Sequence, residues 1–165
     1  MGDKAWWKEV YKALSDSTIG AQNFDFLWRV CRGALKTGEF VSRYNIPGTR
    51  TKCVFCFDKL ETVEHLFSEC SCLSKVRQTI VGGVEQLGLT IDPNDYLPLL
   101  CIGIGYQTST RVTRSRIMNL VGECNRRIWV VRNSALFGNS RIDTRKLECI
   151  IEAIVTRRVR STLSV

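Results

Sequence analysis

The chain has one histidine and three prolines among its 165 residues, and both scarcities limit what it can be. A single His65 can serve only one site, so it cannot be both a catalytic base and a metal ligand. With so few prolines and no low-complexity tract, a long linker is not expected. Residues 1–165 are therefore predicted to form a single domain.

Long apolar runs are also missing from the sequence. No stretch approaches the length of a membrane span, and the N-terminal residues lack the apolar segment of a secretory signal peptide. The chain is expected to be intracellular, nuclear or cytoplasmic, with no membrane partner. In that reducing setting the eight cysteines are expected to be free or metal-bound rather than paired in disulfides.

Four potential metal ligands are spaced as in a zinc site. Cys53 and Cys56 are followed after eight residues by His65 and after four more by Cys70. Three thiolates and an imidazole predict a closed, tetrahedral, structural zinc site. Because His65 and Cys70 lie about 140° apart on an ideal helix, Cys70 is expected where that helix ends or bends. Cys72 is an alternative fourth ligand, and ordinary buried thiols with a surface histidine are the alternative to a metal site.

Apolar residues recur at helical spacing, which predicts an all-α fold: a helical bundle with an inserted CCHC zinc knuckle, made of a small hairpin and a short helix. The expected helices span 4–15, 24–35, 38–44, 73–87, 111–137 and a final segment capped by Asp143 or Thr144. The predicted parts are N-terminal helices (1–49), the zinc knuckle (50–72) and basic C-terminal helices (73–165).

Several local sequence features predict helix caps, a helix break and buried cysteines. Asn23 or Asp25, Thr37 and Thr62 are expected to cap helices, and Gly82-Gly83 is expected to break or kink the helix over 73–87. Residues 96–105 are predicted to be a short apolar helix or an extended segment. The cysteines on or near apolar runs are expected to be buried thiols: Cys31, Cys101, Cys124 and Cys149.

Positive charge is concentrated in the last third of the chain. Residues 1–102 contain 12 Lys and Arg against 12 Asp and Glu, whereas residues 103–165 contain 12 against 4. This asymmetry predicts a polyanionic partner, RNA or single-stranded DNA, although a solvated helical face or an acidic protein partner is the alternative. The side chains expected to contact phosphates are Arg50, Lys52, Arg111, Arg114, Arg116, Arg126 and Arg127.

No catalytic constellation is evident. Glu61 and Glu64 are close to the metal motif, but four protein ligands leave no open position on the ion. Asp92 and Asp95 flank a proline in a predicted turn rather than converging on a metal pair. The glycines Gly103 and Gly105 lack the rest of a phosphate-binding motif. The chain is predicted not to be an enzyme.

From Trp28 onward the residues resemble the zinc-binding domain that follows the reverse transcriptase in LINE-type (non-LTR) retrotransposons. The matching residues are Leu27-Trp28, Gly33-Ala34-Leu35-Lys36-Thr37, Arg43, Cys53-x2-Cys56 and Glu61-Thr62-x2-His65-Leu66-Phe67-x2-Cys70. Lys36 departs from the pattern, since the family commonly has proline there.

The resemblance implies a reverse transcriptase upstream, and hence that the chain is either an excised C-terminal piece or a stand-alone remnant. It also implies a role in binding template RNA or target DNA during target-primed reverse transcription. Two alternatives are a protein-interaction or scaffold domain, whose N-terminal helix with Trp6 and Trp7 docks on a polymerase or another partner, and a degenerate reading frame without function.

Overall fold

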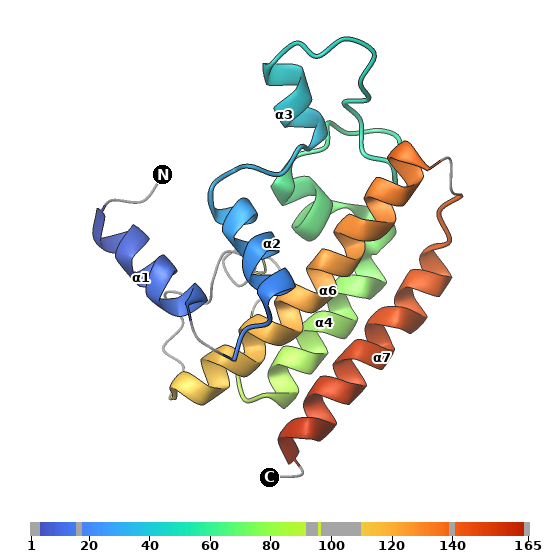
Figure 1. The fold of residues 1–165 in the computed structure, drawn as a ribbon. Helices are drawn as coiled ribbons and strands as arrows, with labels where there is room; N and C mark the ends of the chain where they lie inside the picture. Colours follow the sequence, from blue (N-terminus) through green and yellow to red (C-terminus); the bar gives the residue numbers. More distant parts are fainter. Residues whose placement is uncertain (1–3, 16–17, 92–95, 97–109, 139–140, 164–165) are drawn as a thin grey trace.

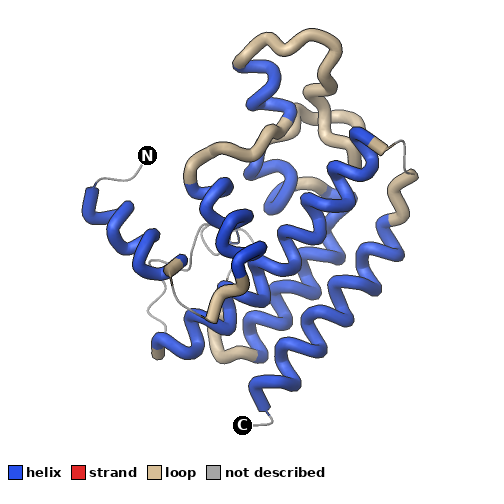
Figure 2. The backbone as a smooth tube through the Cα atoms, in the orientation of Figure 1, coloured by secondary structure: helices blue, strands red, loops and turns tan. Residues whose placement is uncertain are grey.

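The computed structural model describes residues 4–15, 18–91, 96, 110–138 and 141–163, without the side chains of Trp6, Glu9 and Leu163. The helices are α1 (Lys4–Leu14), α2 (Ala21–Cys31), α3 (Gly38–Arg43), α4 (Ser74–Gln86), α6 (Arg111–Phe137) and α7 (Thr144–Leu163), with a π-helical turn η1 (His65–Glu69) and a 3-10 turn η2 (Ser71–Leu73). No strand occurs in these ranges, and Figure 2 shows helices joined by loops. The predicted all-α class is confirmed.

Helices α4, α6 and α7 lie side by side and enclose the largest part of the core (Figure 1). Each contributes fully buried aliphatic side chains, such as Ile80 from α4, Leu120 from α6 and Ile151 from α7. In α4 and α7 the buried side chains recur at three- and four-residue steps on one face, whereas α6 also buries residues against α2.

A glycine allows the close approach of these three helices. A Cβ atom on Gly83 would lie 2.7 Å from Val155 Cγ1 and 3.1 Å from Leu120 Cδ2. Helix α4 runs through Gly82 and Gly83 without interruption. The predicted break was wrong, because tertiary packing against α6 and α7 outweighs the low helix propensity of glycine.

Helix α2 packs on α6, and α1 packs on α2. Leu27 of α2 is buried, and a Cβ atom on Gly122 of α6 would lie 3.2 Å from its Cδ1 atom. The rings of Trp7 and Trp28 meet edge to face with centroids 6.0 Å apart. This contact places Trp7 in the packing of α1 on α2, as its helical spacing suggested.

Most predicted helix ends are close to the observed ones. Helix α6 has the predicted bounds, Thr37 caps α3 by accepting from Phe40 N at 3.4 Å, and Asp143 caps α7 by accepting from Lys146 N at 3.0 Å. Helix α2 was placed wrongly: it starts at Ala21 with Gly20 as N-cap, and it ends at Cys31. Asn23 and Asp25 therefore lie inside α2 rather than capping it.

The remaining cysteines divide by exposure. Cys124 is buried as predicted and Cys31 is partly buried against the core, whereas Cys149 is exposed and its prediction was wrong. Cys149 follows the buried Leu147 by two positions on α7, which turns it toward the opposite face of the helix. Cys101 and the glycines Gly103 and Gly105 lie outside the described residues.

None of the helices in the described part of the chain has the combination of length and apolar character needed to cross a membrane.

Candidate metal centre and basic surface

The first two metal ligands lie on a tight hairpin. Lys52 and Leu60 form an antiparallel bridge, and Cys53 N donates to Lys59 O at 2.9 Å. Phe57 N donates to Cys53 O at 2.9 Å, which closes the turn around Cys56. The backbone fixes the two cysteines on one side of this turn, where their thiols can bind the same ion.

The other two ligands come from the segment that follows. Thr62 Oγ1 accepts from His65 N at 2.8 Å, so Thr62 caps this helical segment as predicted. The segment widens into the π-helical turn η1, and Cys70 N donates to His65 O at 2.7 Å. Cys70 itself is extended, with φ −61° and ψ 117°. The expectation that Cys70 lies where the helix ends is confirmed, and the wider turn brings residues five apart onto one side.

The four ligand atoms gather in a small cluster. All lie within 4.8 Å of one another, with Cys53 Sγ 4.0 Å from Cys70 Sγ and Cys56 Sγ 3.4 Å from His65 Nε2. Zn–S and Zn–N bonds of about 2.3 and 2.0 Å in a tetrahedron place sulfurs about 3.8 Å apart and sulfur and nitrogen about 3.5 Å apart. The donor set and its dimensions fit zinc, and four protein ligands describe a closed site.

Electrostatics in the cluster favour a thiolate at Cys53 but not at Cys70. The hydrogen bond between the two sulfurs lowers the pKa of Cys53, although burial opposes the shift. The pKa of Cys70 is raised in turn, because one proton is held between the two sulfurs. Zinc binds thiolates, so it replaces this proton. Cys72 is exposed and is not part of the cluster, whose fourth potential ligand atom is the Sγ atom of Cys70.

Arg77 of α4 adds a contact that the sequence did not reveal. Its Nη1 donates to Cys70 O at 2.6 Å, and burial lowers the pKa of its guanidinium. The positive charge therefore lies close to a centre that carries about one net negative charge when three thiolates and neutral His65 hold zinc.

Glu61 connects the knuckle to the rest of the fold. Its Oε1 accepts from Gly38 N at 3.3 Å and from Arg132 Nε at 3.0 Å, and its carbonyl accepts from Glu39 N at 2.9 Å. Arg132 Nη2 also donates to Lys36 O at 3.1 Å. Arg132 is only 2% exposed, so its charge is buried against the knuckle.

Five of the seven basic residues expected to contact phosphates lie on α6. Arg111 and Arg127 are exposed, and Arg114, Arg116 and Arg126 are partly buried. Arg126 Nε donates to Asn23 Oδ1 at 3.2 Å, so one of the hydrogen-bond donors of Arg126 is used within the fold. Arg50 and Lys52 belong to the knuckle, which contacts the C-terminal part of α6 through Glu61 and Arg132.

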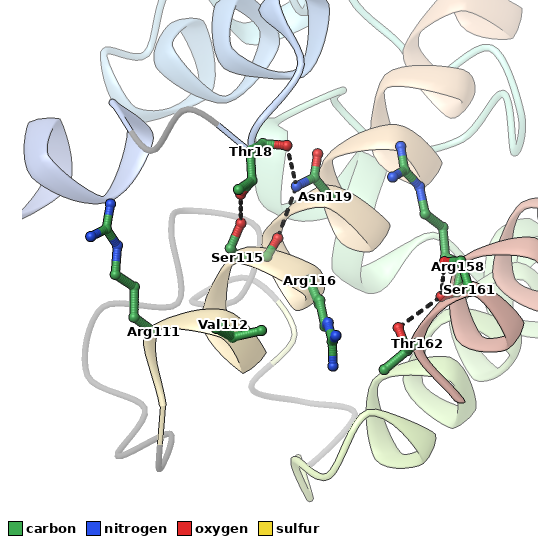
Figure 3. A pocket seen from close by; sticks show the side chains of 9 residues that line it. All are labelled: Thr18, Arg111, Val112, Ser115, Arg116, Asn119, Arg158, Ser161 and Thr162. Atoms are coloured by element: carbon green, nitrogen blue, oxygen red, sulfur yellow. Dashed lines mark hydrogen bonds between the residues drawn. The ribbon is translucent and has the colours of Figure 1, made fainter. Parts of the chain in front are cut away.

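One pocket of about 500 Å³ lies between the first turns of α6 and the last turns of α7 (Figure 3). Its described lining consists of Thr18, Arg111, Val112, Ser115, Arg116, Asn119, Arg158, Ser161 and Thr162, with no carboxylate among them. The pocket thus combines three arginines with several hydroxyl groups. Arg158 was not among the basic residues that the sequence predicted to contact phosphates.

Glu123 partly compensates the charge of α7. It pairs with Arg157 and with Arg158, whose Nη2 lies 2.8 Å from Glu123 Oε2. Burial alone would raise the pKa of Glu123, but the hydrogen bonds from Arg158 and Arg157 outweigh it and leave the pKa lowered. Of the three arginines that line the pocket, Arg158 therefore has a charge that is partly compensated within the fold.

A comparison with known protein families agrees with this cluster of potential zinc ligands. Residues 3–76 match a family model described as zinc-binding in reverse transcriptase. The chain is 29% identical over 96 residues to "Transposon TX1 uncharacterized 149 kDa protein" of Xenopus laevis, a match that covers 58% of this chain and 7% of that protein. No solved structure matches. The chain thus spans a small fraction of the length of the curated relative that it matches.

Proposed function

We propose that this chain is a non-catalytic, zinc-stabilised module that binds nucleic acid. The match of residues 3–76 to a family model described as zinc-binding in reverse transcriptase supports the zinc-stabilised part of this proposal. The place of the chain would be the C-terminal part of a retrotransposon polyprotein, next to a reverse transcriptase domain, where it would assist binding of template RNA or target DNA. The clustering of Cys53, Cys56, His65 and Cys70 supports these four as the zinc ligands.

In this proposal the metal has a structural role. Zinc would hold the hairpin of Cys53 and Cys56 against the turn that carries His65 and Cys70. It would supply no reactive position, because four protein ligands complete its shell. The knuckle then presents Glu61 to α3 and α6, and those contacts fix its place in the molecule.

The observation that carries the nucleic-acid proposal is the arginine-lined pocket between α6 and α7. Guanidinium groups bind phosphate oxygens through paired N–H donors, and three arginines line this pocket. The positive end of the α6 dipole, which has no acidic residue in its first turn, also favours an anion there. Such contacts position a phosphate backbone without reading its sequence.

The test is a binding series on RNA, single-stranded DNA and duplex DNA at increasing salt. About four phosphate contacts to a single strand would make log K fall with log salt with a slope of about −3. The double variant Arg111→Gln/Arg116→Gln, which removes two of the four contacts, should make the slope shallower by about 1.5. Arg145→Gln, which changes an exposed arginine at the start of α7, is the matched control. Absence of affinity, or an affinity independent of salt, would reject the proposal.

A second candidate function is protein interaction through α1. A groove of about 1060 Å³ runs between α1, α2 and α3, and its lining includes Trp7, Tyr11, Trp28 and Phe40. Tyr11 is 59% exposed. A partner segment from a polymerase could occupy this groove. Tyr11→Ala should then break association with the reverse transcriptase domain in a pull-down experiment while RNA affinity stays unchanged.

A further inference from the structure

Phe57 adopts a backbone conformation that normally favours glycine. Its φ angle is +60°, in the left-handed region where a Cβ atom crowds the backbone. The hairpin uses only its backbone here, through the hydrogen bond from Phe57 N to Cys53 O. Glycine would supply that N–H without strain. The fold therefore gives a reason for the turn but none for a phenylalanine at this position.

The side chain of Phe57 contributes nothing to the core. It is 58% exposed and is absent from the set of residues that pack in the apolar cluster. Its one described ring contact is with Arg50, whose Cζ atom lies 4.9 Å from the ring centroid. Phe57 thus combines a strained backbone with an exposed aromatic ring that has no packing role. This combination points to a ligand, since backbone strain is retained where function requires it.

The chain segment that contains Phe57 exposes apolar side chains and is basic. Half of the exposed large apolar side chains in the described part of the chain come from residues 44–60: Tyr44, Ile46, Phe57 and Leu60. The charged residues of the same segment are Arg50, Lys52 and Lys59 against Asp58. Exposed aromatic rings beside uncompensated cations are the elements with which proteins bind single-stranded nucleic acids.

We propose that Phe57, together with Arg50, forms a stacking platform for an unpaired nucleobase. The base would stack on the aromatic ring and guanidinium, while Lys52 and Lys59 contact the neighbouring phosphates. The excess of cations over acids in this segment favours a nucleic acid over a protein segment as the occupant. The interaction needs an unpaired base, so it would distinguish single strands from duplexes, which phosphate contacts alone do not.

This platform is separate from the pocket between α6 and α7. Arg132, which contacts the knuckle through Glu61, and Arg111, which lines the pocket, are 21 residues apart on one continuous helix, or about 30 Å along its axis. The inference rests on the proposed nucleic-acid function but assigns it a second, chemically different contact. A short oligonucleotide could engage either site, and a longer strand could engage both.

The decisive variant is Phe57→Gly, because it relieves strain while removing the ring. Its unfolding temperature with zinc bound should equal or exceed that of the original chain. Its affinity for single-stranded oligouridine and oligodeoxythymidine should fall about five-fold or more, since stacking of one base has at least that effect. Affinity for a duplex of the same length should stay unchanged.

Matched controls separate the ring from the backbone. Asn45→Gly changes the other non-glycine residue with positive φ in the described ranges, at +47°, and should leave all affinities unchanged. Phe57→Tyr should retain single-strand affinity, whereas Phe57→Leu, which is apolar but not aromatic, should lose it. Phe57→Leu also provides the test if the glycine variant fails to fold.

Several outcomes would overturn the platform. Undiminished single-strand affinity in Phe57→Gly or Phe57→Leu would exclude stacking, and an equal loss for duplex would show a general electrostatic effect. Loss of binding to a reverse transcriptase domain with unchanged oligonucleotide affinity would identify a protein contact instead. If Arg111→Gln/Arg116→Gln keeps full affinity while Phe57→Gly loses it, the pocket fails and the platform stands.

Discussion

Glu61 and Arg132 form a salt bridge that is almost wholly excluded from solvent, with side-chain exposures of 1% and 2%. The two residues are 71 positions apart, and the pair joins the zinc knuckle to α6. Trp129 makes a cation–π contact with Arg132, whose guanidinium lies 4.7 Å from the centroid of the Trp129 ring. A charge in this position is tolerated only while its partner is present.

Removing the cation should therefore be strongly destabilising. Arg132→Met leaves the Glu61 carboxylate buried without its counter-charge and should lower the free energy of unfolding by about 3–5 kcal/mol. Urea denaturation with zinc in excess measures this loss. Arg127→Met, at an exposed position of the same helix, should change stability by less than about 0.5 kcal/mol. Equal stabilities for the two variants would mean that the buried pair does not hold the knuckle.

Two adjacent glycines of α4 should respond in opposite ways to alanine. Gly82→Ala places its Cβ where nothing lies within 4 Å and should stabilise the protein by about 0.5–1 kcal/mol. Gly83→Ala directs its Cβ into Val155 and should be destabilising, by about 1–3 kcal/mol. Thermal unfolding of both variants distinguishes the two effects. Stabilisation by both would show that the contact between α4 and α7 is looser than the structure has it.

Removal of zinc should unfold the knuckle before the long helices. Without the ion, the ligand bonds that join the hairpin of Cys53 and Cys56 to the turn of His65 and Cys70 are lost, whereas α6 and α7 bury their own apolar faces. Hydrogen exchange after chelation should show loss of protection in 50–72 with protection retained in α6 and α7.

Serine substitutions test the assignment of the fourth ligand. Cys70→Ser should reproduce the exchange pattern of the chelated protein, and Cys72→Ser should behave as the unsubstituted chain. The opposite result would make Cys72 the ligand. Simultaneous loss of protection in α6 would show that the helices depend on the metal as well.

Acid should weaken the contact between α6 and α7. The pKa of Glu123 is lowered in the folded state, so its carboxylate contributes stability that is present above the ordinary value of 4.5 and is lost as pH falls through the lower folded value. The effect is modest, because Arg157 is 63% exposed and Arg158 36%. In denaturation measured against pH, Glu123→Gln should give a flatter profile than the unsubstituted chain below pH 4.5. Parallel profiles would contradict the assignment.

The sequence predicted features that depend on spacing or periodicity along one segment. The distances between Cys53, Cys56, His65 and Cys70 predicted a cluster whose atoms do gather. The apolar repeat over 111–137 predicted α6 to the residue. The metal cluster depends on ligand residues within one short segment, and α6 depends on an apolar repeat within one helix. Both patterns can therefore be recognised in the sequence without knowledge of the fold.

Features that depend on distant partners were missed. The periodicity of α6 places Arg132 on a polar face, and only the folded chain brings Glu61 to it. Gly83 resembles a helix breaker until Val155 of α7 is placed beside it. The start of α2 was misplaced because Asn23, a common capping residue, accepts instead from Arg126 of α6. The exposure of Phe57 likewise follows from turn geometry that residue spacing does not indicate.

The π-helical turn η1 has a consequence for α4. Cys70 ends η1, and only the three residues of η2 separate it from the first residue of α4. The ion that fixes Cys70 would thereby also fix the rotational phase of α4. Deleting one residue from η1 would turn α4 by about 100° about its axis, and the face that meets α7 would be replaced by a polar one. The zinc knuckle would therefore determine which face of α4 packs against the other core helices.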